Sequence, residues 1–129
     1  MNEKTGLEAE HESKKVIQDK SKAFALRTIK LYQYLKDDKK EYVLSKQLLR
    51  SGTSIGANVR EAQRAQTKAD FYAKLFIALK EADESSYWLE LLFESGFLNK
   101  KEYSSIYKDS EEIVALLVAI TKKQNLKKF

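Results

Sequence analysis

The stretch that decides the fold is residues 45–66, SKQLLRSGTSIGANVREAQRAQ. At about 100° per residue it reads as one helix with three faces. The predicted core face, which begins one residue earlier, holds Leu44, Leu48, Gly52, Ile55, Val59, Ala62 and Gln66. The opposite face, which we call the basic stripe, holds Lys46, Arg50, Arg60 and Arg64. A third strip holds Ser45, Leu49, Gly56 and Gln63, with Gly52 at its edge. Small residues at such spacing allow another helix to approach closely.

The rest of the chain is also helical in pattern. It has no proline and only four glycines, which favours long helices. Apolar residues at helical spacing predict helices over residues 14–36, 39–66, 68–94 and about 100–124. The pairs that predict helix starts are Asp38 with Glu41, Thr67 with Asp70, and Asn99 with Glu102. Gly96 is predicted to end the third helix in a left-handed conformation.

These elements predict one domain over residues 14–126, an all-α, antiparallel, up-down-up-down four-helix bundle. Residues 1–13 are polar and without periodicity, so we expect them to be disordered. No segment is apolar enough to span a membrane and the N-terminus has no signal region, so we expect a cytoplasmic protein without membrane contact.

The side-chain inventory argues against an enzyme. The chain has no cysteine, and its one histidine, His11, precedes the predicted bundle. Bundle di-metal centres need inward histidines as well as carboxylates, so we expect no metal and no cofactor. Glu81 and Glu84 lie beside the core series and are predicted to pair with a cation of a neighbouring helix. The serines of the bundle have no evident activating base.

Positive charge suggests a polyanionic partner. The formal charge is +5 and the pI is about 9.2. We interpret the basic stripe as a track for nucleic-acid phosphates, for which arginine is well suited. The alternative is that the stripe is a solvated face without a ligand. Most aromatic residues lie at core spacing, so direct base recognition is not indicated.

Surplus apolar surface predicts self-association. A single bundle hides one face per helix, yet further apolar and small residues lie beside the core lines. The predicted oligomer interface comprises Leu49, Gly52, Gly56, Gln63, Phe76, Tyr87 and Trp88. A contact between different faces must close into a ring or continue as a filament.

Several segments carry a family resemblance: FALRTIKLY (24–32), LLRSGTSIGANV (48–59), EA (61–62), DFYAKLFIAL (70–79) and EADESSYWL (81–89). The chain resembles, over about residues 16–120, the bacterial four-helix bundle proteins of intervening sequences in 23S ribosomal RNA genes. A related branch is the accessory variability protein of diversity-generating retroelements. The resemblance implies a ring-shaped homopentamer without known catalytic residues. For the retroelement branch it implies binding to RNA and to a reverse transcriptase.

The sequence thus predicts a non-enzymatic, self-assembling, basic helical-bundle protein that binds RNA through backbone phosphates. The alternative is a protein-only scaffold or adaptor, for example for a reverse transcriptase, with no direct nucleic-acid contact.

Overall fold

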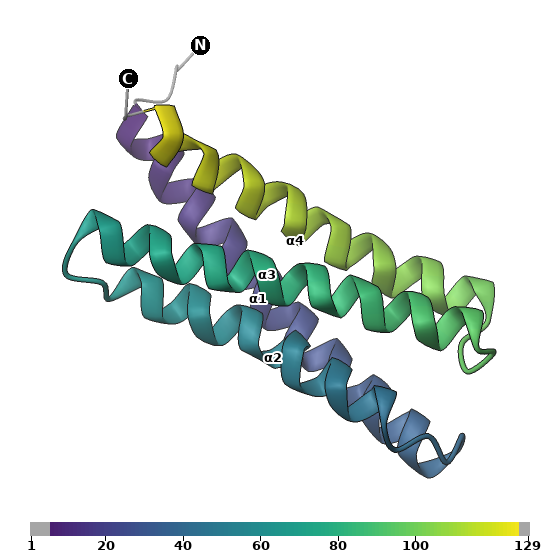
Figure 1. Ribbon diagram of the computed structural model, residues 1–129. Helices are drawn as coiled ribbons and strands as arrows, with labels where there is room; N and C mark the ends of the chain where they lie inside the picture. The colour runs from purple at the N-terminus through teal and green to yellow at the C-terminus, as the bar shows by residue number, and fades with distance from the viewer. Residues whose placement is uncertain (1–5, 127–129) are drawn as a thin grey trace.

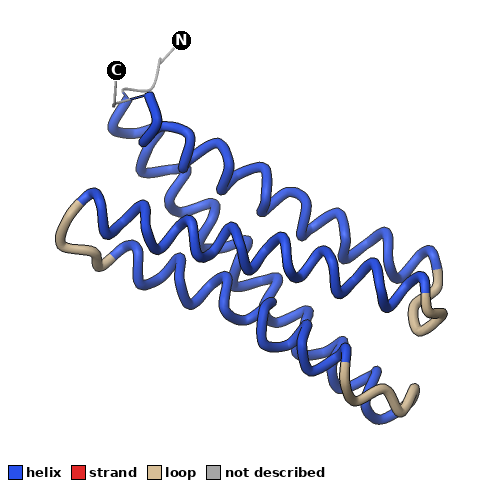
Figure 2. Tube along the Cα trace, in the orientation of Figure 1, coloured by secondary structure: helices blue, strands red, loops and turns tan. Residues whose placement is uncertain are grey.

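The computed structural model describes residues 6–126, which form four α-helices and contain no strand (Figures 1 and 2). The helices are α1 (Gly6–Asp37), α2 (Leu44–Gln63), α3 (Lys68–Glu94) and α4 (Lys100–Leu126). Helices α2 and α3 lie side by side, and the start of α1 lies near the end of α4 (Figure 1). The predicted all-α four-helix bundle is confirmed.

The core forms from one apolar line on each helix. Its fully buried large side chains are Ile17, Phe24, Leu35, Leu48, Ile55, Val59, Leu75, Leu89, Leu92, Ile113 and Leu117. Each such side chain contributes about 1.5–3 kcal/mol relative to exposure. Helix α2 packs most extensively, against α3 and α1, whereas α1 and α4 make the least extensive contact among neighbouring helices. The bundle is therefore tightest around α2 and loosest between α1 and α4.

The start of α2 differs from the prediction. The helix begins at Leu44, not near Lys39, because Lys40 adopts a left-handed conformation with φ 56°. The Glu41 carboxylate accepts hydrogen bonds from the amides of Val43 (3.1 Å), Leu44 (3.0 Å) and Ser45 (2.7 Å). The predicted Asp38–Glu41 capping box is therefore wrong, since Glu41 caps the helix that begins after it.

Burial raises the pKa of Glu41, but the three amide donors outweigh it and hold the pKa below its ordinary value.

The C-terminal end of α2 also differs from the prediction. The helix stops at Gln63, so Gln66 is exposed beyond the helix and does not lie on its core face.

The two other predicted caps are present. The Thr67 hydroxyl accepts a hydrogen bond from the Asp70 amide at 3.0 Å. Asn99 and Glu102 form a reciprocal capping box, with both amide-to-side-chain distances at 2.8 Å. Gly96 has φ 87°, the left-handed conformation predicted after α3.

The N-terminal segment needs a correction. Helix α1 begins at Gly6, so residues 6–13 are helical where the sequence predicts disorder, and residues 1–5 lie outside the described range. This stretch contains alanine and several glutamates, which are good helix formers, and Glu8 lies in the first turn, where an anion favours the helix dipole.

Candidate nucleic-acid interface

Two pairs of buried serines join the helices on either side of α3. Ser51 and Ser85 lie 2.8 Å apart across the α2–α3 contact, and Ser86 and Ser110 lie 2.9 Å apart across the α3–α4 contact. Each pair satisfies its hydroxyls with the partner serine and main-chain carbonyls. Within the described range no hydroxyl of these pairs bonds to a histidine or carboxylate side chain, so they act as structural links between helices.

The small strip of α2 meets α1 of the same chain. A Cβ atom built on Gly52 would lie 2.5 Å from Thr28 Cγ2 and 2.9 Å from Thr28 Oγ1. A Cβ on Gly56 would lie 3.4 Å from the Ser21 main-chain oxygen. Gly52 is buried in this intramolecular contact, so its predicted place in an oligomer interface is wrong. Gly56 also faces α1 but remains partly exposed.

The other predicted interface residues divide by exposure. Leu49 and Gln63 are half-buried on α2, and the Gln63 amide donates to the Val59 carbonyl oxygen of its own helix at 3.2 Å. On α3, Phe76 is 42% and Tyr87 is 53% exposed. Trp88 is half-buried against Tyr87, with ring centroids 5.3 Å apart. The outer side of α3 therefore offers aromatic surface.

The basic stripe is only partly available. The Arg50 guanidinium pairs with Glu81 at 3.3 Å and with Glu84, both on α3. This confirms that these two glutamates pair with a neighbouring helix, and it neutralises the middle of the stripe. The sequence predicts that Glu81 and Glu84 pair with a cation of a neighbouring helix, but it does not show that this cation is Arg50 of the basic stripe.

The three remaining cations of the stripe, Lys46, Arg60 and Arg64, are exposed. None of them makes an ion pair within residues 6–126. Arg60 stands at the edge of a groove of about 590 Å³ between α1 and α2. The walls of this α1–α2 groove include small side chains, among them Ala25 and Ala57. An exposed guanidinium or ammonium of this kind can contact a phosphate without losing an internal partner.

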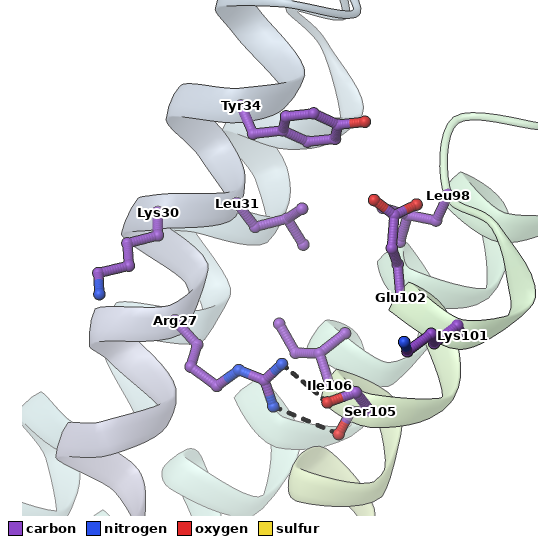
Figure 3. Close-up of a pocket in the computed structure, with 9 residues that line it drawn as sticks. All are labelled: Arg27, Lys30, Leu31, Tyr34, Leu98, Lys101, Glu102, Ser105 and Ile106. Carbon is purple, nitrogen blue, oxygen red and sulfur yellow. Dashed lines mark hydrogen bonds between the residues drawn. The ribbon is translucent and has the colours of Figure 1, made fainter.

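A second cavity, of about 470 Å³, opens between α1 and α4 (Figure 3). Among neighbouring helices, α1 and α4 make the least extensive contact. The sequence did not predict this cavity. The reason is that Leu31 and Ile106 lie at core spacing in the sequence, which predicts core residues and not the wall of a cavity. Arg27 of α1 crosses below it to Asp109 (2.6 Å) and to the Ser105 hydroxyl (3.0 Å) on α4. Cavities of this size are common for small-molecule binding.

Two tyrosines of α4 have raised pKa values. Burial, followed by the hydrogen bond and negative charge of Glu111 and the charge of Glu90, raises the pKa of Tyr107 to about 12. Burial and the charge of Glu90 also raise the pKa of Tyr103. A tyrosine phenol is protonated at neutral pH in any case, and the raised pKa values of these two move them further from a role as general base.

In the described range, no cluster of three or more histidine or carboxylate side chains is placed to hold a metal ion. No helix between residues 6 and 126 has the length and apolarity needed to cross a bilayer.

The structure is that of a small, basic, four-helix bundle with exposed cations along α2. The chain belongs to the 23S rRNA-intervening sequence protein family, whose model matches residues 13–119. It is also similar to a crystal structure of a protein with unknown function from the S23 ribosomal protein family of Bacteroides thetaiotaomicron VPI-5482. The identity is 55%, the match covers 85% of this chain and 98% of that chain, and the TM-score is 0.84. The chain matches no curated protein.

Proposed function

We propose that this protein is a non-enzymatic, cytoplasmic, RNA-binding bundle that contacts backbone phosphates through Lys46, Arg60 and Arg64. The observation that supports this proposal is the exposure of these three cations, two on α2 and Arg64 directly after its last residue, without ion pairs in the described range. From the first to the last they extend over about 27 Å by helical rise. Arg50 is left out because its charge is matched by Glu81 and Glu84.

The salt dependence of RNA affinity tests this proposal. Each phosphate contact contributes a slope of about −0.7 for single strands when log K is plotted against log salt. The triple variant Lys46→Gln, Arg60→Gln, Arg64→Gln should therefore flatten the slope by about 2. A matched control, Lys80→Gln, Lys122→Gln, Lys123→Gln, removes the same charge from exposed positions on other helices.

The control should keep most of the wild-type slope. Equal flattening by both triple variants would mean that net charge and not the stripe sets the affinity. Absence of any RNA binding by the wild-type protein at low salt would refute the proposal.

We also propose that the bundle, with its helices antiparallel in up-down-up-down order, assembles through unlike faces. The outer side of α3 presents Phe76, Ile77 and Tyr87, and the α1–α2 groove presents small side chains that can receive large ones. Asp83 falls between Phe76 and Tyr87 on the same side of α3, and Lys22 lines the groove. These surfaces are therefore complementary in size, and Lys22 offers Asp83 an opposite charge in a groove that also holds Asp19, Arg60 and Glu61.

A contact between unlike faces closes into a ring if its rotation allows, and the family resemblance implies five protomers. Light scattering should then report about five times the 14.9 kDa chain mass. The double variant Phe76→Ser, Tyr87→Ser should reduce this mass, whereas Tyr42→Ser, which changes another exposed tyrosine, should not. A monomeric wild-type protein would refute assembly, and another oligomer size would refute the pentamer.

The exposed apolar residues of α3 also favour a second candidate function, a protein-only scaffold, for example for a reverse transcriptase. Assembly without RNA binding at low salt would select this candidate.

A further inference from the structure

The cavity between α1 and α4 has an apolar and aromatic wall (Figure 3). Leu31 from α1 and Leu98 from the loop before α4 lie at its middle, and Ile106 from α4 lines its lower part. The ring of Tyr34 lies across its upper end (Figure 3). The cavity is thus bounded by side chains that would bind the flat, weakly polar face of a ring.

Two cations lie near this cavity, Lys101 as a lining residue and Lys39 beside the ring of Tyr34. The Lys101 side chain reaches from α4 toward the open space (Figure 3), and it makes no ion pair in the described part of the chain. The Lys39 ammonium lies 5.9 Å from the centroid of the Tyr34 ring. Arg27 is paired with Asp109 and also donates to Ser105. The Glu102 carboxylate lines the cavity too and keeps its negative charge, although it accepts a hydrogen bond from the Asn99 amide. Lys30 and Lys101, both lining residues, outnumber this carboxylate, so the net charge of the lining is positive.

Lys101 is also unusual in its position. It lies in the first turn of α4, where the helix dipole favours anions and disfavours a cation. A bound phosphate beside it would offset this unfavourable charge.

We propose that this cavity holds one unpaired nucleotide of a bound single-stranded RNA. The base stacks on Tyr34 above Leu31 and Ile106, and the flanking phosphates contact Lys101 and Lys39. An aromatic face combined with cations is the usual way in which proteins hold single-stranded nucleic acid, since every base has a stacking face. The inference rests on the proposed RNA binding, to which it adds a preference for unpaired strands.

The size of the cavity favours a nucleotide over an acidic peptide helix. Its α1 lining runs from Arg27 to Tyr34, two helical turns or about 10 Å. This length accommodates one base with its sugar, whereas an amphipathic helix docks along a longer continuous groove with several anchors.

The test compares single-stranded RNA of about ten nucleotides with a duplex of equal length, using fluorescence anisotropy at fixed salt. Tyr34→Leu retains apolar volume but removes the stacking face, and should weaken single-strand binding about fivefold or more while leaving duplex binding unchanged. Tyr42→Leu changes an exposed tyrosine outside the cavity and serves as the matched control.

Lys101→Gln should also weaken single-strand binding. Because it removes a cation from the first turn of α4, it should raise the melting temperature of the protein, so lost affinity cannot be attributed to unfolding. In a second measurement, 4-thiouridine in the RNA should crosslink to peptides that contain residues 27–39 or 98–106.

Unchanged single-strand affinity in both cavity variants would overturn this inference while leaving the phosphate track in place. Crosslinks confined to α2 would have the same meaning. An acidic amphipathic peptide that binds the wild-type protein but not Tyr34→Leu, with RNA affinity unaltered, would also overturn it. Loss of all RNA binding in the wild-type protein would instead remove the proposed function itself.

Discussion

The two glycines of α2 that face α1 should respond in opposite ways to the same substitution. In Gly52→Ala the new Cβ would lie 2.5 Å from Cγ2, 2.9 Å from Oγ1 and 3.0 Å from Cβ of Thr28. Rotation of Thr28 would not relieve the clash, because its Cβ is itself too close. Rotation would also break the hydrogen bond from Oγ1 to the Ala25 carbonyl oxygen, at 2.8 Å. The two helices must therefore separate to admit one methyl group.

The size of the effect follows from two opposing terms. Overpacking costs about 1–3 kcal/mol, and three contacts this short place Gly52→Ala toward the upper part of that range. Replacing glycine by alanine inside a helix recovers about 1 kcal/mol. Gly52→Ala should therefore lower the free energy of unfolding by about 1–2 kcal/mol. In Gly56→Ala the nearest atom is the Ser21 oxygen at 3.4 Å, so the gain in helix propensity should leave stability equal or higher.

Urea unfolding followed by circular dichroism measures both effects. The protein concentration must be equal in all samples, since self-association would add to the apparent stability. A double-mutant cycle locates the clash, because Thr28→Ala should recover about 1 kcal/mol or more in the presence of Gly52→Ala. The reasoning would be refuted by a Gly52→Ala variant as stable as Gly56→Ala, or by the absence of coupling to Thr28.

Three further substitutions test electrostatic and hydrogen-bonding features. Glu41→Gln should destabilise the protein by about 1–2 kcal/mol at neutral pH, because it weakens a charged cap on three amides. The pKa of Glu41 in the folded protein lies below its ordinary value of 4.5. Its contribution to stability is therefore present above pH 4.5 and is lost as the pH falls through the lower folded-state pKa, and acid unfolding of the variant should lack this component. Arg50→Gln should change stability by no more than about 1 kcal/mol, since its guanidinium is half-exposed, and should leave the salt slope of RNA binding as in the wild type. A slope as flat as that of the stripe variant would return Arg50 to the phosphate track. The pKa of Tyr107 is raised to about 12, so wild-type stability should fall between pH 10 and 12, and Tyr107→Phe should show a smaller loss in alkaline unfolding. Identical alkaline curves for the two proteins would contradict this assignment.

The exposed residues of α2 and α3 together suggest how assembly and RNA binding can coexist. Phe76 and Tyr87 lie on α3, whereas Lys46 and Arg64 lie at the two ends of the α2 stripe. Closure of a ring through α3 and the α1–α2 groove would repeat Lys46 and Arg64 around its surface, while Arg60, which lines that groove, would lie at the edge of the contact. Repeated contacts of this kind raise overall affinity without any new contact within one protomer.

Sequence alone determined the helices and most of their ends. Apolar periodicity placed Leu48, Ile55 and Val59 in the core, and local side-chain chemistry placed the caps at Thr67 and Asn99. These features depend on residues within one or two turns of each other, so they can be read from spacing. Three helix ends were predicted wrongly: the start of α1, the start of α2 and the end of α2. The start of α2 is also a local feature, but no glycine in the sequence marks the left-handed conformation of Lys40 that delays it.

Only the tertiary structure decided which surface each helical face meets. The 3.6-residue period gives the direction of a side chain around its own helix but says nothing about the neighbour that lies there. Thus Gly52 turned out to face Thr28 of the same chain, and Arg50 turned out to be neutralised by α3. The cavity beside Tyr34 likewise exists because α1 and α4 pack less extensively than the other pairs, and the distance between two helices is set by all the side chains that separate them.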